Sequence, residues 1–121
     1  MTKAQAIHNY FSGFGLKAYP KESVPDNVKF PWLTYEVSTA DFGDQVSVAI
    51  DLYYHTTSEK TPNDKAEEIG RAIGRGGKII ACDGGAIWIK KGTPWSISLT
   101  DENDAEIKRR QLSCTFEFLA E

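Results

Sequence analysis

Hydrophobic residues at two different spacings divide this chain into helical and extended segments. Near the start, Ala4, Ile7 and Phe11 recur at helical spacing, Thr2 stands where a helix cap is expected, and Gly13 breaks the pattern. This predicts a short amphipathic helix. The following residues, 17–31, contain three prolines, which remove backbone donors and favour extended neighbours. We expect an ordered loop or an irregular arm there.

Two extended runs come after the arm. One begins at Trp32 and reads WLTYEVS, and the other begins at Val46 and reads VSVAIDLYYH. In the second run, apolar residues occupy every other position, which is the strongest strand pattern in the chain. The segment TADFGD (39–44) between the runs has the composition of a turn, so we expect the two strands to form a hairpin.

A second helix is expected from Thr61, with that hydroxyl as its N-cap, Pro62 at the first helical position and Asp64 near the positive end of the dipole. Arg75 and Gly76 are expected to form a cationic last turn and a left-handed stop. Its predicted buried stripe consists of Ala66, Ile69, Ala72 and Ile73.

The glycine-rich segment GRAIGRGGKII (70–80) could be taken for a phosphate-binding loop. Aligning Gly77 and Lys78 with the G-K of a P-loop puts Ala72 at the first glycine position and Ile79 at the hydroxyl position. Both that motif and the dinucleotide-binding loop precede a helix, whereas these glycines follow one. We therefore expect a helix stop and no nucleotide site.

The last third of the chain is read as strands. KIIAC (78–82) and AIWIKK (86–91) flank a DGG turn, which predicts a second hairpin. Gly92 and Pro94 then separate a further strand, WSISL, and after an acidic turn the final run ends with alternating apolar residues. The chain is thus predicted to be a single α+β domain, residues 1–121, with a mostly antiparallel or mixed sheet of about five to six strands packed by two helices.

Composition restricts the classes of function. Fourteen basic against seventeen acidic residues give a net charge of -3, so the basic excess of a nucleic-acid-binding protein is missing. No apolar run approaches the roughly 20 residues that span a bilayer, and the start lacks the apolar region of a signal peptide. We expect no membrane partner and synthesis in the cytoplasm. Cys82 and Cys114 lie far apart in apolar segments and are expected to be structural thiols.

Residues with catalytic or metal-binding chemistry are few. His8 and His55 have no metal-ligating neighbour at the close spacing of a zinc site, and neither has a nucleophile partner recognisable in the sequence. The segment DENDAE (101–106) carries calcium-type oxygens but lacks the glycine and distal glutamate of a calcium loop, so a solvated turn is expected. We predict no catalytic residue, no cofactor and no metal.

The three tryptophans are candidates for an assembly interface. Trp32 and Trp95 each follow a proline, and Trp88 stands between two isoleucines, so at least one residue of that triplet must point away from a one-sided core. Two interpretations remain open: a sheet covered on both faces by the two helices, or a protein–protein surface anchored by tryptophan.

The turn at 39–44 is a second candidate contact. Phe42 stands among polar residues, between Asp41 and the pair Gly43 and Asp44. One interpretation is a mobile loop in which Phe42 adds little to the core and docks a partner, together with Asp41 and Asp44. The alternative is an ordinary turn with a partly tucked phenyl ring.

The order of these segments resembles the tail terminator or tail-completion family of long-tailed bacteriophages, whose members include minor capsid and neck proteins. The resemblance extends from Ile7 to Leu119. It is carried by fold patterns, of which the most telling are Pro31 with Trp32, Thr34 and Tyr35, the pair Leu52 and Tyr53, and Glu67, Glu68 and Ile69.

This resemblance implies a small α+β protein that forms a ring, commonly a hexamer, at the end of the tail tube in the virion. The implied partners are other copies of the chain, the tail tube protein and the head–tail connector or stopper, and no catalysis is implied. Two alternatives remain: a small cytoplasmic enzyme or ligand-binding domain with a pocket between sheet and second helix, or a phage head-closure or tube protein.

Overall fold

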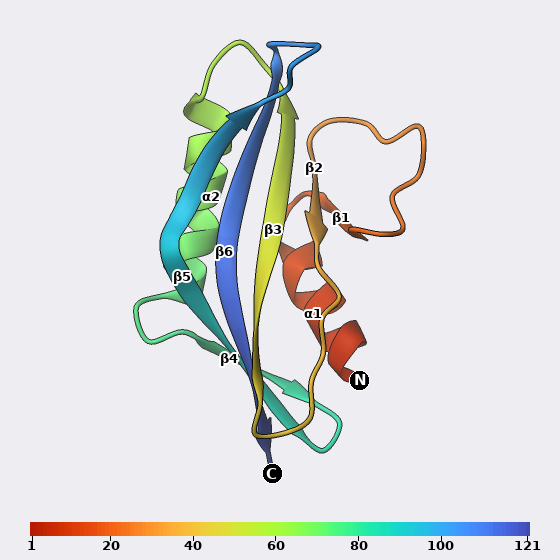
Figure 1. Cartoon of the computed structure of the whole chain (residues 1–121), viewed down its shortest axis with the longest axis vertical. Helices are drawn as coiled ribbons and strands as arrows, with labels where there is room; N and C mark the ends of the chain where they lie inside the picture. The colour runs from red at the N-terminus through yellow and green to blue at the C-terminus, as the bar shows by residue number, and fades with distance from the viewer.

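The computed structural model describes all residues, 1–121, and contains one six-stranded sheet in the order β1-β2-β3-β6-β5-β4 (Figure 1). β1 and β2 are parallel and all other neighbours are antiparallel. The predicted α+β class is therefore confirmed. The elements are α1 (Lys3–Phe11), a short 3-10 helix (Ser12–Phe14), β1 (Lys17–Pro20), β2 (Trp32–Tyr35), β3 (Gln45–His55), α2 (Lys60–Ile73), β4 (Lys78–Cys82), β5 (Gly85–Thr100) and β6 (Ile107–Ala120).

The two longest regular pairings involve β6, which lies between β3 and β5. Val48 pairs with Cys114 and Ile50 with Leu112, so the alternating apolar residues of both strands point to the same face of the sheet. These side chains are all buried. The strand patterns seen in the sequence therefore set the centre of the core.

Both helices cover this one face. Phe11 of α1 contacts the rings of Tyr35 and Phe116, and Ile69 and Ile73 of α2 belong to the same cluster of 19 buried hydrophobic residues. The opposite face carries no helix, which Figure 1 shows as the broad front of the sheet. A sheet covered on both faces, one of the two interpretations left open by the sequence, is thus not what the chain forms. Neither helix has the length and apolar character needed to cross a membrane.

The proline-rich arm contains a strand that the sequence did not predict. Residues Lys17–Pro20 pair in parallel with Trp32–Tyr35 and form one edge of the sheet. Proline is tolerated at such an edge because the donor that it lacks is not needed for pairing there. The expected irregular arm is confined to the residues between these two strands.

β5 is one strand where the sequence predicted two. Its register with β6 is broken between Lys91 and Ser96, so that Gly92 and Pro94 leave the ladder while both flanking segments remain paired. An irregularity of this kind accommodates residues that would otherwise interrupt pairing. The long partner strand β6 holds the two halves in one sheet.

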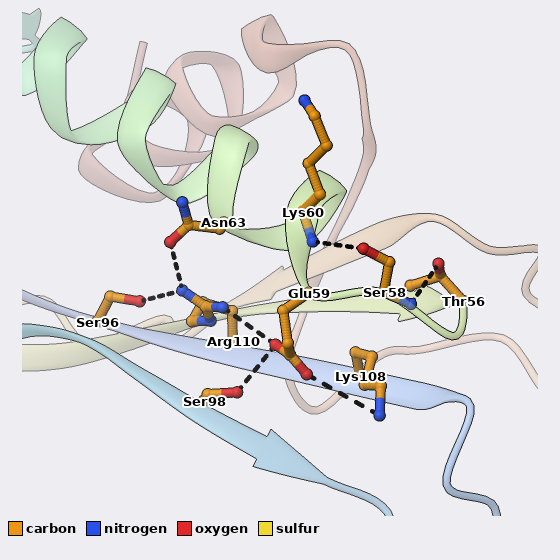
Figure 2. A network of polar contacts seen from close by, with 9 residues as sticks. All are labelled: Thr56, Ser58, Glu59, Lys60, Asn63, Ser96, Ser98, Lys108 and Arg110. Carbon is orange, nitrogen blue, oxygen red and sulfur yellow. Dashed lines mark hydrogen bonds and ion pairs between the residues drawn. The ribbon is translucent and has the colours of Figure 1, made fainter.

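The start of α2 lies earlier than expected, with Glu59 at the N-cap position and no side-chain cap. The Glu59 carboxylate accepts hydrogen bonds from Arg110 (3.1 Å) and Ser98 (3.0 Å), and Lys108 lies 3.9 Å away (Figure 2). Arg110, only 8% exposed, also donates to Asn63 and to Ser96. This network fixes the chain to the sheet before Thr61, so the helix begins at Lys60 and the predicted threonine cap is wrong.

The end of α2 also differs from the prediction. The helix ends at Ile73 with Gly74 as its C-cap, and the positive φ angles belong to Gly74 and Gly77 rather than to Gly76. Ala72 is exposed, and Gly70 is buried in its place. The ring of Trp95 packs so closely on Gly70 that a Cβ there would lie only 3.0 Å from the indole nitrogen. The glycines do follow a helix and lead into β4, as expected.

Candidate interaction surface

The uncovered face of the sheet carries an aromatic cluster at one end. Trp32, Tyr53, Arg109 and Leu99 are lateral neighbours across β2, β3, β6 and β5. The rings of Trp32 and Tyr53 stack with centroids 4.0 Å apart and planes 6° apart, and Phe30 packs beside Trp32. The stack holds both half-buried rings in a fixed orientation, as an interface anchor requires.

Polar residues occupy the next row of the same face. Asp51 is only 3% exposed, its carboxylate accepts a 3.4 Å hydrogen bond from Gln111, and Arg109 Nε lies 3.5 Å away. Burial raises the pKa of Asp51, while Arg109 and Gln111 oppose that effect by favouring the charged form. The row therefore gives the face a polar centre beside the aromatic cluster.

Trp88 lies on the uncovered face toward the other end. Ile87 and Ile89 on either side of it are fully buried beneath the helices, as the alternation of a strand requires. The Trp88 indole N–H donates to the carbonyl of Gly76 at 2.9 Å, and the Lys90 ammonium lies 4.4 Å from its ring. The expectation that this triplet directs apolar surface away from the core is confirmed.

Trp95 occupies a different environment from the other two tryptophans. It is half-buried against α2, and its indole N–H donates to the carbonyl of Ala66 at 3.2 Å. The ring follows the interruption at Pro94, and Gly70 leaves room for it. Because its ring already packs against α2, Trp95 does not contribute to the uncovered face.

The turn at 39–44 holds Phe42 against the body of the protein. The ring is half-buried next to the core, packs over the turn at Gly84 and Gly85, and has Lys3 Nζ 4.3 Å from its centroid. The neighbouring Gly43 N–H donates to the carbonyl of Phe118 at 2.6 Å. The ring is therefore partly tucked, and the expectation that Phe42 adds little to the core is wrong. Docking of a partner by Asp41, Phe42 and Asp44 stays a prediction. Asp41 and Asp44 have exposed side chains.

Replacing Phe42 by alanine is expected to lower the free energy of unfolding by about 1 to 2 kcal/mol, less than a fully buried phenylalanine would cost. Asp44→Ala, in the same turn, should stay within about 0.5 kcal/mol of the wild type because its side chain is exposed. Urea denaturation of both variants measures the difference. Equal stability of the two would mean that the ring does not pack as described.

His8 forms contacts that the sequence did not reveal. Its Nδ1 lies 2.6 Å from the Tyr35 hydroxyl and its Nε2 lies 3.3 Å from the Ser12 hydroxyl. Burial raises the pKa of Tyr35, so this group stays neutral and cannot stabilise an imidazolium as a triad carboxylate does. His8 and Ser12 line part of an open hollow of about 620 Å³. The contact between His8 and Tyr35 joins α1 to β2. In the sequence, only the i, i+4 spacing of His8 and Ser12 indicated one of these contacts, the one between their side chains.

His55, Asp104 and Glu106 come together at the end of β3, with ligand atoms within 4.8 Å of one another. His55 Nε2 lies 3.1 Å from Asp104, and the Glu106 amide donates to the other oxygen of Asp104 at 2.9 Å. That backbone bond and His55 both lower the pKa of Asp104. The pairing of β3 with β6 creates this group, which ties the acidic turn to the sheet.

The pocket expected for a small enzyme, between α2 and the sheet, is filled by side chains. Ala66, Ile69 and Ile73 of the helix are buried there, and Trp95 closes the space beside them. The uncovered face of the sheet, in contrast, is not occupied by the helices of the chain (Figure 1). Comparison with known protein families, curated proteins and solved structures finds no significant match.

Proposed function

We propose that this protein is a structural component of a long-tailed phage or prophage that caps the tail tube as a ring. The ring, most simply a hexamer, ends tube growth and presents a surface for the head connector or stopper. The observation that carries this proposal is the uncovered sheet face with its fixed Trp32–Tyr53 stack. A face of this kind suits a protein whose role is to bind other copies and neighbouring tail proteins.

The order of elements that resembles tail terminators is the second support. The resemblance is carried by Pro31 with Trp32, Thr34 and Tyr35, by the pair Leu52 and Tyr53, and by Glu67, Glu68 and Ile69 in α2. In the structure the first two of these groups lie at the neighbouring strands β2 and β3, since Trp32 pairs with Tyr53 and Leu33 with Leu52. Two residues that carry the resemblance, Trp32 and Tyr53, thus form the aromatic end of the uncovered face, whereas Leu52 belongs to the core.

The charge of the chain suits a conduit for DNA. Its net charge is -3, and a protein through which DNA slides should not hold phosphates tightly. A head-closure or tube protein would share this property, and the location of the protein in the particle distinguishes these roles. The site of assembly would be the host cytoplasm and the final location the tail end of the virion.

Deleting the gene from its phage or prophage is expected to give tails of irregular, excessive length that do not join heads, because nothing stops tube growth. Supplying the wild-type chain with an affinity tag should restore normal particles. Gold labelling of the tag and electron microscopy should place the protein as a ring at the head-proximal end of the tail. Normal tails without the gene, or label along the tube or within the head, would contradict the proposal.

A further inference from the structure

Two separate surface segments of the molecule carry opposite charges. The loop between β5 and β6 holds four carboxylates within residues 101–106 and lies at one end of the long axis, whereas the segment joining α2 to β4 lies in the opposite half (Figure 1). Arg71 in the last turn of α2, Arg75 in that segment and Lys78 at the start of β4 are all exposed, and none is in an ion pair within the chain. These two segments therefore differ in the sign of their charge, although the net charge of the chain is only -3.

Other charges near these groups do not cancel the separation. At the acidic loop, Lys108 and Arg109 are directed to Glu59 and Asp51, so their charges are already matched. At the other end, the last two exposed carboxylates of α2 are Glu67 and Glu68. Glu68 already pairs with Lys65 at 3.0 Å, so Arg71, Arg75 and Lys78 leave an excess of positive charge over residues 67–78.

Each charged group lies beside apolar side chains of the uncovered face. Ile79 is 59% exposed and pairs with Trp88 next to the basic segment. Ile97, 40% exposed, and Leu99 lie beside the acidic loop. We call Arg71, Arg75, Lys78, Ile79 and Trp88 the basic end, and Ile97, Leu99 and residues 101–106 the acidic end. Each end has the apolar centre and charged margin typical of a protein interface.

We propose that the basic end of one copy binds the acidic end of the next, so that the ring closes through head-to-tail contacts; this inference rests on the proposed function. Two different surfaces that bind each other generate a ring when the rotation closes, as a cap on a cyclic tube requires. A two-fold contact through either end would instead bring like charges together, which is unfavourable. Charge complementarity thus favours a head-to-tail arrangement, in which each end of one copy binds the opposite end of another copy.

Charge reversal at each end separately tests the contact. Arg75→Glu with Lys78→Glu reverses the basic end, and Glu102→Lys with Glu106→Lys reverses the acidic end. The side chains of Asp101 and Asp104 are avoided because they accept backbone hydrogen bonds that shape the loop. Each reversed variant should keep the thermal midpoint of the wild type. The fraction of tube ends capped by a ring should fall by about tenfold or more.

Combining the reversals should restore assembly. A chain with all four substitutions regains complementary ends, and an equal mixture of the two single-end variants can alternate around a ring. Electron microscopy of tubes produced with each variant counts capped ends. Lys17→Glu with Lys29→Glu is the matched control, because both lysines are exposed, form no ion pair and lie outside both ends. This control should form rings as the wild type does.

Two results would overturn the contact while leaving the proposed function intact: rings from either reversed variant, or no recovery in the combined variant although it is folded. If the basic end instead binds DNA or the tube protein, its reversal will not be rescued by changes at the acidic end, which also overturns the contact. Wild-type protein that never caps tubes would refute the proposed function itself, and the contact with it.

Discussion

Replacing Gly77 by alanine is expected to destabilise the protein by about 3 kcal/mol or more. Gly77 has a φ of 85°, and a Cβ at this position would meet the indole nitrogen of Trp88 and lie 2.7 Å from the carbonyl oxygen of Ile89. The left-handed conformation costs roughly 1 to 3 kcal/mol for an ordinary residue, and overpacking adds a similar amount. Because the oxygen belongs to the backbone of β5, side-chain rotation cannot relieve both contacts.

The adjacent Gly76 supplies a matched control. A Cβ there would have no neighbour within 4 Å, and its φ is not positive. Gly76→Ala should therefore change the free energy of unfolding by no more than about 0.5 kcal/mol. Thermal and urea denaturation of both variants measure the contrast. Similar stabilities would mean that the chain between α2 and β4 takes another path, and would also remove Trp88 from its place beside Gly76.

Cys114 is expected to be nearly unreactive in the folded protein. Burial raises the pKa of its thiol to about 12, so at pH 8 only about one molecule in ten thousand carries the thiolate that attacks a thiol reagent. In the unfolded chain, a thiol with a pKa near 8.5 is about one-quarter ionised at that pH. In a Cys82→Ala variant, labelling of Cys114 should accelerate more than about 1,000-fold on unfolding. Rapid labelling of the folded variant would contradict the burial of this residue.

The same pKa shift makes stability depend on pH. Between about pH 9 and pH 12 the unfolded state loses the Cys114 proton while the folded state keeps it, so the unfolded state gains stability as pH rises. The free energy of unfolding should fall by up to about 1.4 kcal/mol per pH unit in this window. Burial also raises the pKa of Tyr10, Tyr35 and Tyr54, which acts with the same sign at higher pH. Comparison with Cys114→Ala between pH 9 and 10 isolates the thiol.

The proposed ring also depends on the two regions that the Gly77 and Cys114 variants probe. Gly77 sets the path of the basic end and the position of Trp88, and Cys114 lies in the core strand that holds β3 and β5 together. A destabilising variant such as Gly77→Ala should reduce assembly because it lowers the stability of the subunit. The charge-reversed variants should lose assembly while folded, which separates the contact from the stability of the subunit.

The sequence by itself determined most of the secondary structure and the residues at the centre of the core. Alternation in β3 and at the end of β6 identified the buried side chains, because successive residues of a strand point to opposite faces. Thr2 caps α1 as expected, its hydroxyl accepting from the Gln5 amide at 3.1 Å. Turn residues likewise located the hairpin at Gly84, whose φ is 82°. Each of these patterns depends only on residues that are close together in the sequence, so the sequence alone reveals it.

Only the tertiary structure decided how the elements cover one another. Local alternation shows that Trp88 and its isoleucine neighbours point to opposite faces, but not which face both helices occupy. Pairing with β6 joins the two halves of β5 across Pro94, and Arg110 moves the start of α2 to Lys60 by binding Glu59. These outcomes depend on contacts between residues about 15 to 50 positions apart, whose energies exceed local preferences. The uncovered face and its oppositely charged ends are visible only once those contacts are formed.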